Sequence, residues 1–171
     1  MGERGTKRRW MNLKRRLGMR RITLAVLGIA VSLCLAGSAF AAGATKDECV
    51  SKTKEAAAMV NEKGLDAATA EINKKDGKFV WKDSYVFLMD FDGKMLGHPM
   101  SPALIGQNVL DRRDKAEKLL FKEFVELAKS KGEGWADYMW ANPGDPKPRK
   151  KISYIYRVPG KNLLVGAGIW E

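Results

Sequence analysis

The alternation of side chains is clearest in residues 85–99. Residues 85–89 (Tyr-Val-Phe-Leu-Met) predict a strand with both faces at least partly buried, because successive side chains of a strand point to opposite faces. Asp92-Gly93 follows and favours a hairpin turn, since glycine accepts the positive φ that such turns need. Pro99 has no N–H to donate and ends the second strand. The segment therefore predicts a β-hairpin with His98, the only histidine of the chain, at its end.

Three helices are predicted from apolar positions that recur every three or four residues. The first covers residues 46–62, with Asp47 as a candidate cap and Gly64 as its stop. A short helix over residues 65–72 follows. The third helix, over residues 114–130, carries a continuous apolar stripe and is expected to cross between the second and third strands of a sheet.

Further strands are predicted before the hairpin and after the third helix, at residues 79–81, 134–140, 152–158 and 162–170. Turn sequences containing proline and glycine, at residues 142–146 and 159–162, join the last three strands. Short connections between consecutive strands favour antiparallel pairing. The predicted fold class is α+β, with an antiparallel sheet of about five strands, a long N-terminal helix and one crossing helix.

The N-terminus is typical of a secretory signal. Residues 22–35 form an apolar run that is shorter than the roughly 20 residues of a membrane span, and Arg20-Arg21 precede it. Residues 39–41 (Ala-Phe-Ala) predict cleavage after Ala41, and translation is expected to start at Met19. Residues 1–41 are therefore assigned as a signal peptide and residues 42–171 as one domain in the periplasm. An uncleaved anchor and a twin-arginine signal are the alternatives.

The charge of the chain belongs mainly to this leader. The chain has 31 basic and 20 acidic residues. Nine of the basic residues and one of the acidic residues lie in residues 1–21, so the rest of the chain has 22 basic and 19 acidic residues, a net charge of +3. The basic composition is therefore no argument for nucleic-acid binding. Cys49 is the only cysteine after the leader and is expected to be either buried or paired with another chain. One histidine and one cysteine far apart predict neither a metal site nor a cofactor.

Five segments in order resemble the single Cache domains of bacterial extracytoplasmic sensors, subtype 2, over residues 45–170. They are the hairpin at 85–99, Leu104-Ile105-Gly106-Gln107-Asn108, residues 132–140 (Gly-x-Gly-Trp-x-x-Tyr-x-Trp), Lys151-Ile152-Ser153-Tyr154 and residues 164–170. The last aromatic is Trp170, where the family usually has tyrosine. The resemblance implies a PAS-like fold that binds small extracellular molecules, often short carboxylates.

In such a fold the sheet forms one wall of a pocket and residues 98–130 form the other. Aromatic residues with a polar tip fall on the predicted strands and suit a small ligand with an apolar body and a charged head: Tyr85, Tyr138, Trp140, Tyr154, Tyr156 and Trp170. The alternative for each is simple core packing.

A carboxylate also needs a cation or a strong hydrogen-bond donor. Lys151 matches the lysine of the family's Lys-x-Ser-Tyr segment, which lines the pocket in family members; otherwise it ends a solvated basic run. His98 could donate to the ligand or bond the backbone, and Arg112 or Arg113 are weaker candidates. The predicted ligand-binding set is His98, Tyr138, Trp140, Lys151, Tyr154 and Tyr85.

The first hypothesis is a periplasmic module that binds or senses a short organic acid and acts through a separate membrane sensor or transporter. The alternative is an envelope interaction protein, as a homodimer through the N-terminal helix or Cys49. An enzyme is disfavoured, since the sequence contains no nucleophile elbow, metal cluster or phosphate loop. Asp90 and Asp92 are expected to shape a turn.

Overall fold

The structure, a computed structural model, describes residues 43–141 and 147–171. The chain divides into two units, Met1–Ala41 and Ala42–Glu171, and the predictions made for the leader and for the turn at residues 142–146 lie outside the described residues. Among the described residues, no helix is long and apolar enough to cross a membrane.

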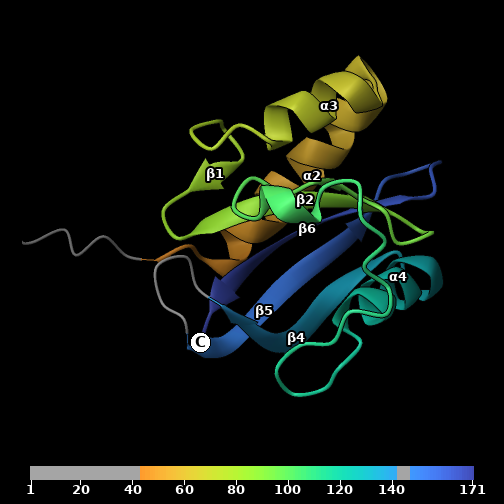
Figure 1. Ribbon diagram of the computed structural model, residues 1–171. Helices are drawn as coiled ribbons and strands as arrows, with labels where there is room; N and C mark the ends of the chain where they lie inside the picture. Colours follow the sequence, from red (N-terminus) through yellow and green to blue (C-terminus); the bar gives the residue numbers. More distant parts are fainter. Residues whose placement is uncertain (1–42, 142–146) are drawn as a thin grey trace, which may run out of the picture. The chain divides into compact units, whose positions relative to one another are not determined.

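The second unit follows the α+β order expected from the sequence (Figure 1). Its elements are α2 (Lys46–Lys63), α3 (Leu65–Ile72), β1 (Val80–Trp81), β2 (Ser84–Asp90), β3 (Met95–Gly97), the 3₁₀ turn η1 (Pro102–Leu104), α4 (Leu120–Ser130), β4 (Glu133–Ala141), β5 (Pro148–Arg157) and β6 (Leu163–Trp170). The sheet has six strands in the order β1-β2-β6-β5-β4, with β3 paired to β2. Every pairing is antiparallel, so the predicted fold class is confirmed.

The cap of α2 differs from the prediction. Thr45, rather than Asp47, is the N-cap residue, and its hydroxyl accepts the Glu48 N–H at 3.2 Å. The Glu48 carboxylate accepts the Thr45 N–H in return, at 2.8 Å. This reciprocal capping box satisfies two backbone amides that have no partner within the helix. A single Asp47 side chain as the cap would not satisfy both.

The turn of the hairpin has the predicted geometry. Gly93 has φ +91°, and the Asp90 carboxylate accepts the N–H groups of Asp92 and Lys94 at 3.1 and 2.8 Å. Asp90 therefore shapes the turn, as expected.

The third helix is shorter than predicted, because α4 begins at Leu120 rather than at residue 114. The Asp114 carboxylate accepts the N–H groups of Ala116, Lys118 and Met139 at 2.8, 2.9 and 2.8 Å. These bonds hold residues 114–119 as a turn against β4, and Glu117 adopts φ 63°. An aspartate that can bond nearby amides competes with helix formation, and here a long-range bond to β4 decides the outcome.

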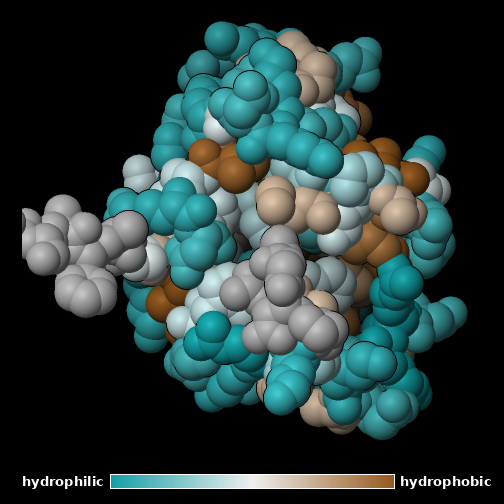
Figure 2. Space-filling model, turned by 60° about the vertical axis from the view of Figure 1, so that its left-hand side comes forward, coloured by the Kyte–Doolittle hydropathy of each residue, from teal (hydrophilic) through white to brown (hydrophobic). Residues whose placement is uncertain are grey.

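Helices cover both faces of the sheet (Figure 1), and each face has its own hydrophobic core. On one face α2 and α3 pack on Val86, Leu88 and Val165. On the other, α4 packs on Phe87 and Leu164, the neighbours of those residues along β2 and β6. The surface view of Figure 2 is mostly hydrophilic, with hydrophobic residues in separate small areas. The core on the α4 face also encloses a small cavity.

Candidate functional site: an aromatic cavity beside a buried lysine

A small cavity lies between the sheet and α4. It is lined by Tyr85, Phe87, His98, Leu120, Phe121, Phe124, Tyr138 and Trp140. Its volume of about 10 Å³ is close to what one water molecule needs. The site is therefore closed, with its aromatic rings packed against each other.

His98 is placed in this wall as a neutral hydrogen-bond donor. Its ring centroid lies 4.9 Å from that of Tyr85 and 6.3 Å from that of Trp140. The Ser101 N–H donates to its Nδ1 at 2.9 Å, so the proton of the neutral ring sits on Nε2. Burial, with a smaller effect of Lys151, lowers the pKa of His98 to about 3. No hydrogen bond of the described residues uses Nε2, which leaves it for a ligand.

Tyr138 is anchored at its tip and packed around its ring. Its hydroxyl and the Ser153 hydroxyl lie 2.8 Å apart, and its ring meets Phe124 edge-on with centroids 5.3 Å apart. Burial raises the pKa of Tyr138 and of Tyr85 above the ordinary value, so both stay protonated. The two phenols are therefore neutral polar groups in an apolar wall.

Lys151 is the most unusual group of the site. Its side chain is 1% exposed, and its Nζ lies 4.1 Å from the ring centroid of Tyr85 and 4.4 Å from that of Trp170. Among the described residues no carboxylate forms an ion pair with it. Burial lowers the pKa of Lys151 to about 7. Two aromatic faces stabilise its ammonium only in part.

The strands explain which predicted residues meet. Four of the predicted side chains project from the sheet face that α4 covers. Three of them line the cavity from the strands: Tyr85, Tyr138 and Trp140. Lys151 of β5 shares this face because it is the direct cross-strand partner of Tyr138 of β4. His98 reaches the same face from the end of β3. Five of the six predicted residues therefore come together, four in the cavity wall and Lys151 against the Tyr85 ring.

Tyr154 does not join them. It lies an odd number of positions from Lys151 on β5, so its side chain points to the opposite face. There its hydroxyl donates to Glu133, and Lys54 Nζ lies 6.0 Å from its ring. Strand alternation, applied to the Lys-x-Ser-Tyr segment, would have selected Ser153 in its place.

Three groups that matter here were absent from the predicted set. Phe121 and Phe124 of α4 close the cavity, and Ser153 holds Tyr138. The apolar stripe of the third predicted helix included Phe124 and was the signal for it, whereas Phe121 lay outside that stripe. Trp170 was noted among the aromatics of the strands, but its contact with Lys151 depends on the pairing of β5 with β6.

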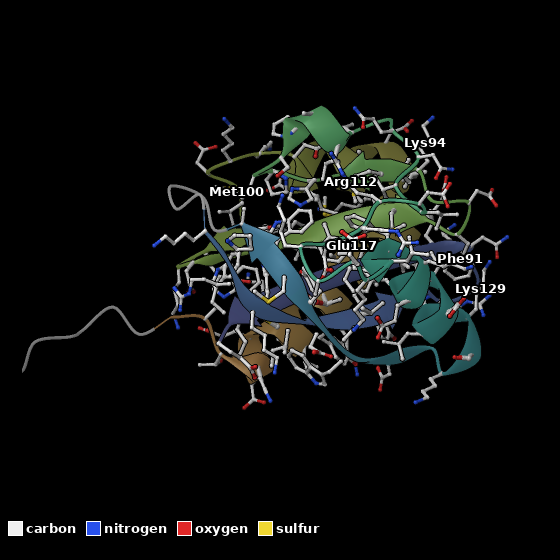
Figure 3. The ribbon with its side chains drawn as sticks, turned by 60° about the horizontal axis from the view of Figure 1, so that its bottom comes forward. Phe91, Lys94, Met100, Arg112, Glu117 and Lys129 are labelled. Atoms are coloured by element: carbon white, nitrogen blue, oxygen red, sulfur yellow. The ribbon has the colours of Figure 1, made fainter. Side chains whose placement is uncertain are left out.

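A larger cleft of about 580 Å³ lies outside the cavity and shares Trp140 with it. Arg112 and Glu117 line the cleft from the segment before α4 (Figure 3). Arg113, from the same segment, lines it as well. The Arg113 guanidinium donates to the Glu117 carbonyl at 2.6 Å. The two arginines are thus placed at the outer cleft and not in the aromatic cavity.

Cys49 is buried on the other face of the sheet. Burial was one of the two alternatives that the sequence left open, the other being a disulfide to another chain. Its side chain is 0% exposed, and its Sγ lies 3.8 Å from the Ser84 hydroxyl. Burial raises its pKa to about 11. A disulfide to a second chain through Cys49 does not fit this position. Within residues 43–141 and 147–171, no group of three acidic, histidine or cysteine side chains could hold a metal ion.

Comparisons with known proteins agree with this architecture. A family model described as dCache_2, a Cache domain, matches residues 45–171. The chain is 29% identical over 175 residues to the methyl-accepting chemotaxis protein McpP of Pseudomonas putida, covering 95% of this chain and 32% of McpP. It is 30% identical over 89 residues to the sensor histidine kinase MctS of Rhizobium johnstonii, covering 52% of this chain and 19% of MctS. The chain thus spans about a third or less of the curated relatives it matches.

Solved structures give the same result. A periplasmic sensor domain of a chemotaxis protein aligns with TM-score 0.59 and 28% identity, over 71% of this chain and 86% of that one. A Cache chemosensory domain, described for its recognition of carboxylic acid, aligns with TM-score 0.58 and 27% identity, over 94% of this chain and 97% of that one.

Proposed function

Because this chain belongs to the Cache domain family, we propose that it is an extracytoplasmic module that senses a short organic acid. The finer assignment, a single Cache domain of subtype 2, is also proposed. Its support is that the described residues between 45 and 171 form one sheet with an aromatic cavity, and that the five family segments occur in order.

The observation that carries the proposal is Lys151. A buried ammonium without a carboxylate partner is costly, and a bound carboxylate supplies the missing charge. The aromatic wall around Tyr85 and Trp140 suits the apolar body of such a ligand, and the His98 Nε2–H is a further donor. A charge-assisted bond of this kind contributes roughly 1.5–3 kcal/mol.

The cavity must enlarge to admit an acid, since about 10 Å³ holds no more than a water molecule. The covering wall consists of α4 and His98, whereas the sheet behind it is continuous. We infer that α4 and the segment before it move outward when the ligand enters. This displacement is the event that a separate membrane sensor or transporter would detect.

The first experiment is a thermal-shift and calorimetric screen of the purified protein against formate, acetate, propionate and butyrate. The matching amides and alkylamines serve as uncharged and cationic controls. Binding of an acid, with no response to its amide, supports the proposal, because a ligand at about 100 times its Kd adds about 2.7 kcal/mol of stability. If no acid binds, the proposal is wrong and an envelope interaction protein becomes the better interpretation.

Two pairs of variants locate the site. Lys151→Met should weaken acid binding at least tenfold, whereas Lys150→Met, at the next and exposed position, should leave it unchanged. Tyr138→Ala should weaken binding, whereas Tyr154→Ala, on the other sheet face, should not. Equal effects within either pair would show that the ligand binds elsewhere.

A further inference from the structure

Lys151 is 1% exposed, and none of the groups near it forms an ion pair with it among the described residues. The groups that face it or act on its charge are Cys49 of α2, Asp83 of the β1–β2 turn, Tyr85 of β2, His98 after β3, Tyr138 of β4 and Trp170 of β6. Asp83 is exposed, and its carboxylate already accepts the Ala44 N–H at 2.7 Å. The amine therefore has aromatic neighbours but no counterion within the part of the chain described.

The other titratable neighbours keep one protonation state near neutral pH. Burial lowers the pKa of His98 to about 3, raises that of Cys49 to about 11 and raises those of the two tyrosines further. Lys151, with a pKa of about 7, is consequently the group of this set that changes charge between about pH 6 and pH 9.

We propose that capture of an organic anion in the aromatic cavity is coupled to the uptake of a proton by Lys151, so that this domain reads ligand concentration and pH together. The inference rests on the proposed function, because it requires an anionic ligand near Nζ. Proton uptake on binding is a property that neither the fold nor the aromatic wall requires. A lysine already paired with a carboxylate of the protein would be charged before the ligand arrives and would take up no proton.

The coupling is a linkage between two binding equilibria. Without ligand, desolvation favours the neutral amine; with a carboxylate nearby, the ammonium is favoured. The proton comes from solvent and is released again when the ligand leaves. At a pH about one unit or more above the pKa of the free amine, each further unit should weaken apparent affinity about tenfold. Below about pH 6 the amine is already charged, so affinity should no longer depend on its titration.

The test is calorimetry of the acid that binds most tightly in the series from formate to butyrate, in buffers with different enthalpies of ionisation. The slope of the observed enthalpy against the buffer enthalpy counts protons. We expect uptake of about half a proton at pH 7, nearly one at pH 8.5 and almost none at pH 5.5. The matching amide, if it binds, should take up none.

Lys151→Arg is the matched variant, because a guanidinium stays charged at all these pH values. It should bind without proton uptake and with an affinity independent of pH between 6 and 8.5. Lys150→Met should retain the proton uptake of the parent. Acid binding without proton uptake at pH 8.5 would overturn this inference and leave the proposed function intact. Failure of every acid to bind would overturn both.

Discussion

Replacing Lys151 with methionine should make the ligand-free protein more stable. A pKa lowered from 10.5 to about 7 corresponds to a cost on the order of 4 kcal/mol at pH 7, at about 1.36 kcal/mol per pH unit. Methionine fills similar space without the charge but loses the contacts of Nζ with the Tyr85 and Trp170 rings. With each contact worth about 0.5–1.5 kcal/mol, the two together offset about 1–3 kcal/mol, and the net gain should be roughly 1–3 kcal/mol.

The gain should depend on pH in a defined direction. Between pH 7 and pH 10.5 the unfolded chain binds a proton at Lys151 that the folded chain has lost, so the parent becomes more stable as pH rises. From pH 7 to pH 8.5 this contribution is about 1.5 kcal/mol, and the advantage of Lys151→Met should shrink by that amount. Measurements should stop near pH 8.5, because Cys49, with a pKa raised to about 11, contributes the opposite slope from about pH 9.

The assay is urea unfolding followed by circular dichroism at pH 7 and pH 8.5, on the parent, Lys151→Met and Lys150→Met. Lys150 pairs with Glu171 at 2.8 Å with both side chains largely exposed, so its replacement should change stability by less than about 0.5 kcal/mol. The reasoning is refuted if Lys151→Met is no more stable than the parent at pH 7, or if its advantage does not change with pH.

Three further predictions concern stability. Because His98 has a pKa lowered from 6.5 to about 3, the parent should lose roughly 1.5 kcal/mol at this group between pH 6.5 and pH 5, and His98→Asn should remove that loss in acid unfolding curves. Asp114→Ala removes the acceptor of three backbone N–H groups and should cost roughly 2–4 kcal/mol in urea unfolding, whereas the exposed Asp111→Ala should cost less than about 0.5; equal effects would contradict the described turn. Gly168→Ala places a Cβ against the Ser153 hydroxyl and the strand backbone and should cost roughly 1–3 kcal/mol; an unchanged unfolding midpoint would count against this packing.

Local sequence rules were sufficient for the hairpin and for the order of the strands, but not for the start of α2, where Thr45 rather than Asp47 is the N-cap. The β2–β3 hairpin follows from alternation and from Gly93, and the sequence of strands follows from turns at short spacing. They failed at residues 114–119, where Asp114 bonds the Met139 amide 25 positions away. The periodicity of residues 114–130 could not reveal that bond, since it depends on how β4 lies against the loop.

The candidate site was predicted from residue types alone. The face of the sheet to which each side chain points decides which of these residues belong to the site. Period-two alternation separates Lys151 from Tyr154, and this rule was available in the sequence. The environment of Lys151 was not available. Its burial needs Tyr85 from β2 and Trp170 from β6, which become its neighbours only through the pairing of three strands.

The closed cavity and the uncompensated lysine have a common consequence for signalling. In the ligand-free state the free energy of unfolding is lowered by the desolvation of Lys151, while packing of α4 on the aromatic rings keeps the cavity shut. A bound acid would remove the desolvation cost of Lys151 and would break part of the packing of α4 on the aromatic rings. Binding energy gained at the lysine would then be available to displace α4, which couples recognition of charge to movement of the covering wall. An apolar ligand of the same size would have to open the cavity without that compensation, so the lysine should select anions through the cost of opening as well as through direct contact.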